Sequence, residues 1–170
     1  MEYQTENLES SHHREDFYCG KEPLDSYIKR QASQDVKRKL AVCFVIIQIE
    51  DNLDKVKGYY TLSIDGISRD LIPTKFQKKF PKTYQSIPTT LIGRLARDKN
   101  FNGKRVGEFL LLDALYKCHI SAKSIASFAV VVDPIDEEAV SFYEKYGFEL
   151  LPDSERMFLP MKTVNQLFED

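Results

Sequence analysis

Two glycines and two cations occur together in one short segment near the middle of the chain, Asn102–Gly107 (NGKRVG). Apolar segments precede and follow it, so the sequence predicts a turn between a strand and a helix. Such a turn exposes backbone N–H groups, and the helix start adds partial positive charge, so the loop could bind phosphate oxygens. An ordinary strand-to-helix turn also uses glycine for its geometry, and the hexapeptide alone leaves both interpretations open.

The loop does not match the two best-known phosphate motifs. A P-loop requires glycine five residues before its Gly-Lys pair, where this chain has Asp98. A dinucleotide-binding loop carries three glycines and follows an early strand, whereas this loop follows the third predicted strand. Nucleotide binding of either kind is therefore not expected.

A tyrosine on a later predicted helix could also do chemistry. Ala139, Phe142, Tyr143 and Tyr146 recur at the spacing of one helical face, and we expect Phe142 and Tyr146 in the core. A phenol has a pKa of about 10 and can protonate a leaving thiolate, whose conjugate acid has a pKa near 8.5. Tyr143 could equally be a core residue with a satisfied hydroxyl.

Cysteine and histidine chemistry is not indicated. Cys19, Cys43 and Cys118 are odd in number and widely spaced, which predicts neither a disulfide framework nor a metal site. Cys43 and Cys118 lie in apolar segments and are expected in the core, and Cys19 has no evident base. The three histidines supply no convincing general base.

Apolar periodicity, glycine and proline predict the elements that position these residues. Pro23 and the apolar spacing after it favour a helix over 23–37, and the apolar run 41–49 favours a strand buried on both faces. Gly147 predicts the end of the helix that carries Tyr143. The remaining predicted elements are strands at 56–67, 89–96, 127–132, 148–150 and 157–159 and helices at 107–120, 137–146 and 163–168, with 41–67 forming a hairpin and 68–88 a surface loop.

Length and composition limit the class of protein. The chain has 170 residues, a formal net charge of −2 and 42% hydrophobic residues, which predicts one globular domain over residues 1–170. A polycationic protein and global disorder are excluded. No apolar run approaches the ~18 residues of a membrane span, and residues 1–14 lack a signal-peptide core. We therefore expect a cytoplasmic protein with an α/β (α+β) fold.

The order of the motifs is more specific than any one of them. Arg94–Asp98, Asn102–Gly107 and Phe142–Phe148 together resemble a GNAT acetyltransferase. Three further segments, residues 17–25, 58–62 and 158–164, resemble the GNAT toxins of bacterial type II toxin–antitoxin systems, so the similarity spans nearly the whole chain. The resemblance implies a GNAT fold, which is a central, mixed and mostly antiparallel sheet flanked by helices.

The resemblance also implies the roles of individual residues. Tyr143 matches the general acid of the family, and acetyl-CoA is the implied cofactor. The residues matched to its pantetheine arm and pyrophosphate are Leu95, Ala96, Arg97, Asn102, Gly103, Lys104, Arg105, Val106, Gly107, Asp136 and Phe142. Arg105 replaces a usual glycine, so it could crowd the phosphate or contact it. Asp136 could instead cap the following helix, which is the commoner use of such a residue.

The toxin resemblance implies that the acceptor is the α-amino group of aminoacyl-tRNA, whose acetylation stops translation. Basic residues that could contact tRNA are Arg38, Lys75, Lys78, Lys79, Lys82 and Arg94. Phe76, Phe80 and Tyr84 could stack on unpaired bases, or Phe76 and Phe80 could pack inward. The alternatives are a GNAT enzyme that modifies a small-molecule or protein amine, and a non-catalytic binding module.

Partners follow only from the family. Relatives are paired with an antitoxin that often carries a ribbon-helix-helix region, and many are homodimers. We expect both for this chain, and no membrane association.

Overall fold

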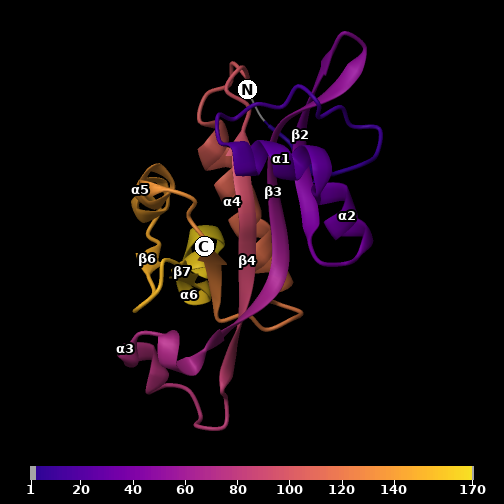
Figure 1. Ribbon diagram of the computed structural model, residues 1–170. Helices are drawn as coiled ribbons and strands as arrows, with labels where there is room; N and C mark the ends of the chain where they lie inside the picture. The colour runs from indigo at the N-terminus through magenta and orange to yellow at the C-terminus, as the bar shows by residue number, and fades with distance from the viewer. Residues whose placement is uncertain (1–2, 170) are drawn as a thin grey trace. The chain divides into compact units, whose positions relative to one another are not determined.

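The computed structural model describes residues 3–169 (Figure 1). The chain forms two compact units, one of residues up to Ser63 with Gly93–Ala114, the other of Ile64–Ile92 with the chain from Leu115 onward. Seven strands belong to one sheet in the order β1-β2-β3-β4-β5-β7-β6. β4 and β5 run parallel, while β1–β2, β2–β3, β5–β7 and β6–β7 are antiparallel. This mixed, mostly antiparallel sheet with its helices confirms the predicted fold class.

The first unit is built on the predicted hairpin. β2 pairs with β3 along nine positions, from Val42 opposite Leu62 to Glu50 opposite Leu53, with a register shift between Ile46 and Ile47. The unit contains β1 (Glu6–Asn7), β2 (Val42–Glu50), α1 (Glu22–Arg30), α2 (Ala32–Lys37) and parts of β3 (Leu53–Ser68), β4 (Ser86–Arg97) and α4 (Val106–Ser121).

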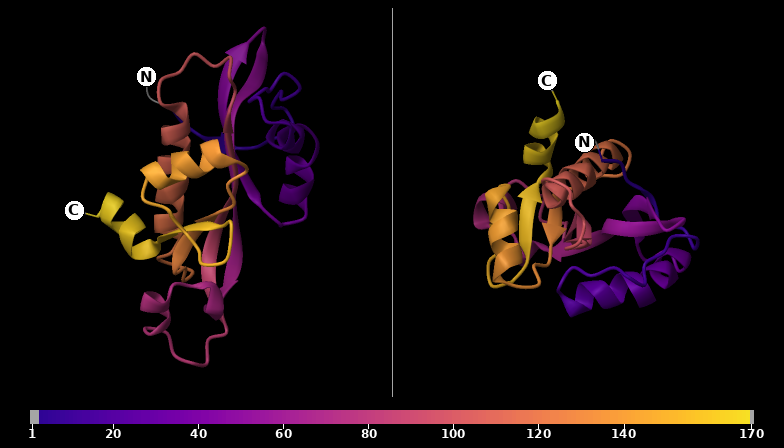
Figure 2. Two further views of the ribbon diagram at one scale, coloured as in Figure 1. Left: turned by 60° about the vertical axis from the view of Figure 1, so that its left-hand side comes forward. Right: turned by 90° about the horizontal axis from the view of Figure 1, so that it is seen from above.

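Two adjacent tyrosines of β3 reach helices on opposite faces of this unit. Successive side chains of a strand point to opposite faces. The Tyr59 hydroxyl donates to the Leu24 carbonyl oxygen of α1 at 2.7 Å, and the Tyr60 hydroxyl donates to Asp113 Oδ2 of α4 at 2.6 Å. The right-hand view of Figure 2 shows α1 and α2 on one side of the hairpin and α4 on the other. The strands are thereby covered on both sides.

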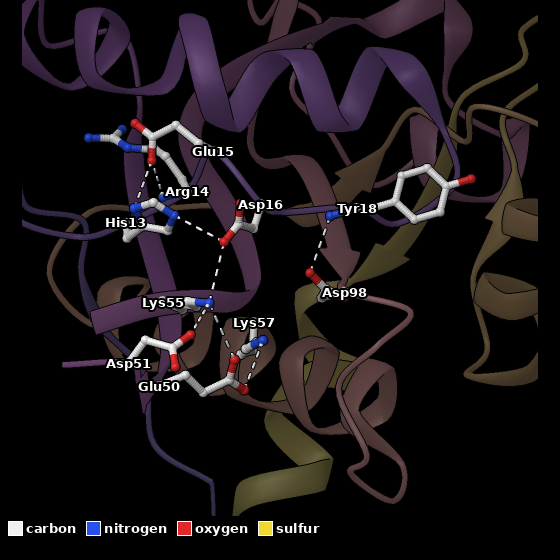
Figure 3. Close-up of polar contacts among 10 residues, drawn as sticks. All are labelled: His13, Arg14, Glu15, Asp16, Tyr18, Glu50, Asp51, Lys55, Lys57 and Asp98. Carbon is white, nitrogen blue, oxygen red and sulfur yellow. Dashed lines mark hydrogen bonds and ion pairs between the residues drawn. The ribbon is translucent and has the colours of Figure 1, made fainter. Parts of the chain in front are cut away.

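The segment before α1 is tied to the hairpin by main-chain and charged contacts (Figure 3). The His13 N–H donates to the Asp54 carbonyl, and its carbonyl accepts from the Val56 N–H at 2.9 Å. Asp16 lies 3.2 Å from His13 Nε2 and 3.3 Å from Lys55 Nζ. Hydrogen bonds from His13 and Lys55 lower the pKa of Asp16. These contacts hold the chain that leads to α1 on the edge of β3.

The second unit contains the helix that carries Tyr143. β5 (Ala129–Val132) is fully buried and pairs with β4 on one side and with β7 (Met157–Pro160) on the other. α6 (Met161–Phe168) contacts both β5 and β7. The remaining elements are the 3-10 turn η1 (Arg69–Leu71), α3 (Thr74–Gln77), α5 (Glu137–Lys145) and β6 (Glu149–Leu150).

Several predicted elements need correction. The helix predicted over 23–37 is two helices that break at Gln31, where φ is −117°. The strand predicted as buried on both faces is exposed at its ends, because Val42 and Ile49 are 44% and 74% exposed. The helix predicted as buried over 107–120 exposes one side through Leu112, Tyr116 and Ile120. The hairpin and the Gly147 helix end, with φ +93°, are confirmed.

Candidate functional site

The C-terminal end of β4 carries main-chain N–H and C=O groups that do not pair with β5. In the described chain, the register of β4 with β5 runs from Thr89 to Ile92, whereas β4 continues to Arg97. The free edge of a strand can pair with an extended ligand by main-chain hydrogen bonds. Leu95 and Arg97, which sequence reasoning matched to the pantetheine arm, lie in this extension. Ala96 between them is buried in the core of the first unit with Phe17 and Tyr59.

Asp98 fixes the start of the loop that follows β4. Asp98 is 3% exposed, and its side chain accepts hydrogen bonds from the N–H groups of Tyr18 at 3.2 Å, as Figure 3 shows, and of Asn100 at 2.7 Å. The Asp98 N–H donates to the Lys57 carbonyl, and the Lys99 N–H donates to the Tyr18 carbonyl. The loop therefore leaves β4 in a defined direction. Sequence reasoning did not single out this role of Asp98.

Gly103 lies where the loop has no room for a side chain. A Cβ atom there would stand 2.4 Å from Tyr3 Oη and 2.7 Å from Val106 Cγ2. The Tyr3 hydroxyl donates to the Lys104 carbonyl at 2.9 Å, and its ring contacts Phe101 and Phe109. Tyr3 thus packs against the loop and holds its main chain. The polar sequence around Tyr3 gave no indication of this contact.

Arg105 has a left-handed backbone, with φ +56°, at the residue before α4. Its guanidinium pairs with Glu108 through two contacts, Nη2 to Oε1 at 2.9 Å and Nε to Oε2. The side chain is 79% exposed and is engaged by this carboxylate one turn along the helix. A left-handed residue beside a helix start lets successive N–H groups converge on an anion.

The loop has features that could bind phosphate oxygens. The first N–H groups of a helix have no intrahelical acceptor, and α4 is 16 residues long. Gly103 is half-buried, whereas Asn102, Lys104 and Arg105 are exposed, so the cations lie on the solvent side. Val106 is 1% exposed and anchors the helix start in the core. The predicted loop residues are thus brought together, with a geometry suited to phosphate oxygens.

In the second unit, Tyr143 is the buried residue of α5. It is 7% exposed, whereas Phe142 and Tyr146, predicted in the core, are only half-buried. Its ring contacts Phe142 and Phe148, each with centroids 5.3 Å apart. Burial raises its pKa, so the hydroxyl keeps its proton at neutral pH. Within residues 3–169, no group forms a hydrogen bond with this hydroxyl, so the phenolic proton is not engaged by the protein.

Asp136 caps α5. Its Oδ1 accepts a hydrogen bond from the Ala139 N–H at 2.9 Å, the pattern expected of an N-cap residue. The loop before it is held by Arg156, whose Nε donates to Asp133 Oδ1 at 2.7 Å and whose Nη2 donates to Asp65 Oδ2 at 2.6 Å. The Asp136 cap and the Arg156 contacts together fix the path by which the chain enters α5, the helix that carries Tyr143.

The lysine-rich loop of the second unit is folded by its aromatic residues. Phe76 and Phe80 pack on Phe128, with centroids 5.5 and 4.9 Å apart, and Phe76 also contacts Phe158. The possibility that these two rings stack on bases is therefore wrong, and the inward orientation is correct. Tyr84 is 55% exposed. The lysines that remain on the surface are Lys75, Lys78, Lys79 and Lys82.

Arg69 holds the turns of this loop together. Its guanidinium donates to three carbonyl oxygens, those of Pro81 at 2.5 Å, Gln77 at 3.0 Å and Phe80 at 2.9 Å. Lys75 lies above the Phe76 ring at 5.1 Å and 4.0 Å from Glu149. The loop is thus an ordered surface that presents its lysines outward.

Two basic residues of the first unit differ in their surroundings. Arg38 is exposed just after α2. Arg94 is half-buried, and its guanidinium carbon lies 3.8 Å from the centroid of the Tyr27 ring. The spacing of the sequence did not indicate this pairing, because Tyr27 is far from Arg94 along the chain.

The three cysteines are buried or half-buried, and His12 and His119 are buried. Burial raises the pKa of the Cys43 and Cys118 thiols to about 12, and burial with a hydrogen bond to Asp25 raises that of half-buried Cys19 to about 11. His12, predicted in a polar terminus, is buried, with Nδ1 accepting from the Glu9 N–H.

Among residues 3–169 there is no cluster of three metal-binding side chains, and no helix there is long and apolar enough to cross a membrane.

Comparison with known proteins identifies the class to which this fold and loop belong. No family model matches the chain. The chain is 32% identical over 164 residues to the probable toxin TacT of Sinorhizobium fredii, which covers 92% of this chain and 89% of the relative. It is 30% identical over 155 residues to a tRNA-acetylating toxin of Mycobacterium tuberculosis, with 91% and 89% covered.

Solved structures agree with these relatives. A tyrosine-to-phenylalanine variant of KacT superposes with a TM-score of 0.90 at 28% identity, covering 99% of this chain and 100% of that one. AtaT complexed with acetyl-methionyl-tRNAfMet gives 0.87 at 26% identity, covering 98% and 99%. AtaTR bound with acetyl-CoA gives 0.84 at 25%, covering 98% of each chain. The chain belongs to the family of GNAT N-acetyltransferase toxins to which TacT belongs.

Proposed function

We propose that this chain is an acetyl-CoA-dependent toxin that acetylates the α-amino group of aminoacyl-tRNA and so blocks translation. The observation that carries the proposal is its similarity, at 30% identity over nearly its full length, to a tRNA-acetylating toxin. The similarity to AtaT in complex with an acetylated aminoacyl-tRNA supports the same acceptor. The glycines of the loop before α4 and the adjacent helix start support binding of the phosphates of the acetyl donor.

The first unit binds the donor in this proposal. The main chain of Leu95 and Arg97 pairs with the extended pantetheine arm, because β5 leaves this edge of β4 unused. The N–H groups from Lys104 to Gly107 hold the pyrophosphate at the start of α4, whereas the Gly103 N–H donates to the Phe101 carbonyl and Gly103 gives the main chain its close approach. Lys104 adds a full positive charge. Acetyl-CoA supplies a thioester that an amine can attack directly, without an enzyme-bound acyl group.

Tyr143 acts as the general acid of the second unit. Its pKa is raised by burial, so the phenol is protonated when the reaction begins. As the amine displaces the thiolate, the hydroxyl gives its proton to the sulfur, and the proton released by the attacking nitrogen passes to solvent, from which the phenolate is protonated again. No described residue forms a hydrogen bond with this hydroxyl, so its proton is available for transfer. Phe142 is proposed to pack beside the donor, and Asp136 contributes through the position of α5.

The acceptor amine needs no strong base. An α-amino group with a pKa of about 7.7–8.0 is substantially deprotonated near neutral pH, whereas a lysine side chain is not. The outward lysines of the loop between β3 and β4, together with Arg38, are proposed to contact tRNA phosphates. Contacts of this kind are sequence-independent and weaken with salt.

The remaining partners follow from membership of a toxin family. We include an antitoxin of ribbon-helix-helix type, a homodimeric assembly and a cytoplasmic location in the proposal. Co-expression with a neighbouring small reading frame, followed by affinity capture and determination of the mass of the complex, tests the first two together.

The proposed function is tested by incubating the protein with labelled acetyl-CoA and a mixture of charged tRNAs. Label is expected in the aminoacyl fraction, and mild alkaline hydrolysis should release it as N-acetyl amino acid. Uncharged tRNA is the matched control, because it offers the same phosphates without the amine. Label that appears only on small amines or on protein would replace this function by a different acetyltransferase activity.

A further inference from the structure

Arg94 holds an oriented positive charge that the protein itself does not neutralise. The guanidinium carbon of Arg94 lies 3.8 Å from the centroid of the Tyr27 ring, and the main-chain N–H of Arg94 donates to Thr61 Oγ1 at 3.1 Å. Within the described chain, no carboxylate forms an ion pair with this guanidinium and no group accepts its N–H hydrogens. A half-buried guanidinium without a carboxylate partner can still bind an anionic ligand through charge-assisted hydrogen bonds.

The stack beneath Arg94 is rigid. The Tyr27 ring is 4% exposed and lies parallel to Tyr59, with an interplanar angle of 18° and centroids 6.2 Å apart. The Tyr27 hydroxyl donates to Asp35 Oδ2 at 2.9 Å, and the Tyr59 hydroxyl donates to Leu24. A guanidinium stacked on an aromatic face keeps its N–H donors in its own plane, directed outward. The donors are thus preorganised for a planar or tetrahedral anion.

Arg94 is directed away from the phosphate loop of the donor. Its stacking on Tyr27 puts the guanidinium on the face of the first unit that α1 covers. The loop Asn102–Gly107 leads into α4, which lies on the opposite face, as the contacts of Tyr59 and Tyr60 establish. The anion that Arg94 binds is therefore a different one from the pyrophosphate, although Arg94 immediately precedes the strand segment proposed to hold the pantetheine arm.

We infer that Arg94 binds the phosphodiester on the 5′ side of the terminal adenosine of the acceptor. This inference rests on the proposed function, in which the acceptor is an aminoacyl ester of that adenosine. The ester and the first phosphodiester are carried by the same ribose, so an enzyme that holds the amine beside the donor also has this phosphate close by. Arg94 is thus a specificity-determining residue that distinguishes a nucleotide-linked amine from a free amino acid.

The test removes the phosphate and the arginine separately. Two minimal acceptors are used, an aminoacyl-adenosine without a phosphate and the aminoacyl ester of the dinucleotide CpA with one. For the unaltered protein, kcat/KM should be ~10-fold or more higher for the dinucleotide ester, in line with one charge-assisted contact. In Arg94→Ala this preference should fall to about 1–2-fold, with the KM for acetyl-CoA unchanged.

Three further variants separate contact from fold. Tyr27→Phe keeps the stacked ring and should keep the preference, whereas Arg94→Lys keeps the charge without the planar donors and should give an intermediate value. Lys123→Ala removes one exposed positive charge elsewhere and should leave the preference intact. Thermal unfolding by circular dichroism confirms that each variant is folded.

Two results would overturn the inference. An undiminished preference for the dinucleotide ester in Arg94→Ala would mean that residues other than Arg94 bind the phosphate. A raised KM for acetyl-CoA with an unchanged preference would assign Arg94 to the donor. Acetylation of neither ester, with charged tRNA also untouched, would instead reject the proposed function and this inference with it.

Discussion

Arg105 and Glu108 form an ion pair one helical turn apart at the start of α4, and this pair directs the guanidinium along the helix. The family usually has glycine at this position of the loop, which raised the possibility of a blocked phosphate site. The pair shows instead that the side chain is held by a carboxylate of its own chain. The negative charge of Glu108 is masked at the same time.

We predict that Arg105→Gly weakens acetyl-CoA binding roughly fivefold, because it leaves Glu108 unpaired beside the phosphates. Arg105→Gly combined with Glu108→Gln should restore the affinity. The unfolding free energy should change by less than about 1 kcal/mol, since relief of the left-handed backbone offsets the loss of an exposed ion pair. Calorimetric titration with acetyl-CoA measures the affinities. Tighter binding by the single variant would mean that Arg105 does crowd the donor.

Tyr143→Phe should lower turnover by ~10²-fold or more, within the range for a lost proton donor. Because no described group bonds to the hydroxyl, its removal should leave the thermal unfolding midpoint nearly unchanged. Steady-state acetyl transfer and a thermal melt are measured on the same sample, with Tyr146→Phe as the matched control. Turnover equal to that of the unaltered protein would exclude Tyr143 from the mechanism.

The pH dependence of the rate should have a rising limb and no falling limb below about pH 10. The acceptor amine loses its proton near pH 7.7–8.0, which produces the rise. Burial raises the pKa of Tyr143, so the folded protein keeps this proton beyond the pH at which a free phenol releases it. The raised pKa therefore reduces stability only above about pH 10, where the unfolded chain would ionise first.

Initial rates between pH 6 and 9.5, at saturating acetyl-CoA, measure this profile. Tyr143→Phe should show the same rise at a lower amplitude, because the rise belongs to the acceptor. A rate that declines between pH 8 and 9.5 with intact substrate would show that an enzyme acid titrates in that interval.

Arg156→Ala should lower the unfolding free energy by about 1–2 kcal/mol, because it leaves Asp65 and Asp133 unpaired at a partly exposed site. Burial acts to lower the pKa of Arg156, but its hydrogen bonds to the two carboxylates outweigh this, and the net pKa is raised. Arg156→Lys should recover only part of the loss, since lysine cannot make the two-sided contact. Urea unfolding measures the unfolding free energies of the two variants. An equal loss for both would contradict the idea that the guanidinium stabilises the fold by contacting both carboxylates at once.

Local patterns were sufficient to predict the parts of the fold that depend on local rules. The hairpin follows from two β-rich runs around a turn, and the end of α5 follows from a glycine that adopts φ +93°. The turn at Asn102–Gly107 between a strand and a helix was predicted from its glycines and the flanking apolar segments, whereas phosphate binding there stays a prediction. Gln31 carries no such indication, since it is neither glycine nor proline, and the break between α1 and α2 was missed.

Contacts between distant segments were beyond what spacing could predict. Phe76 and Phe80 lie among lysines, which is compatible with base stacking or with burial, and only the presence of Phe128 and Phe158 decides for burial. Tyr3 supports the phosphate loop and Tyr27 supports Arg94 from segments remote in sequence. A single side chain of this kind leaves no periodic pattern in its neighbours.

The three carbonyl contacts of Arg69 have a consequence for the thermodynamics of association with a polyanion. A basic segment that orders only on contact would bury new apolar area, which appears as a large negative heat-capacity change. Here the rings of Phe76 and Phe80 are already packed on Phe128, and the turns are already hydrogen-bonded through Arg69, before any ligand arrives. Binding at these lysines should therefore be governed by counterion release alone. The affinity should fall steeply as the salt concentration rises, and the heat-capacity change of binding should be small.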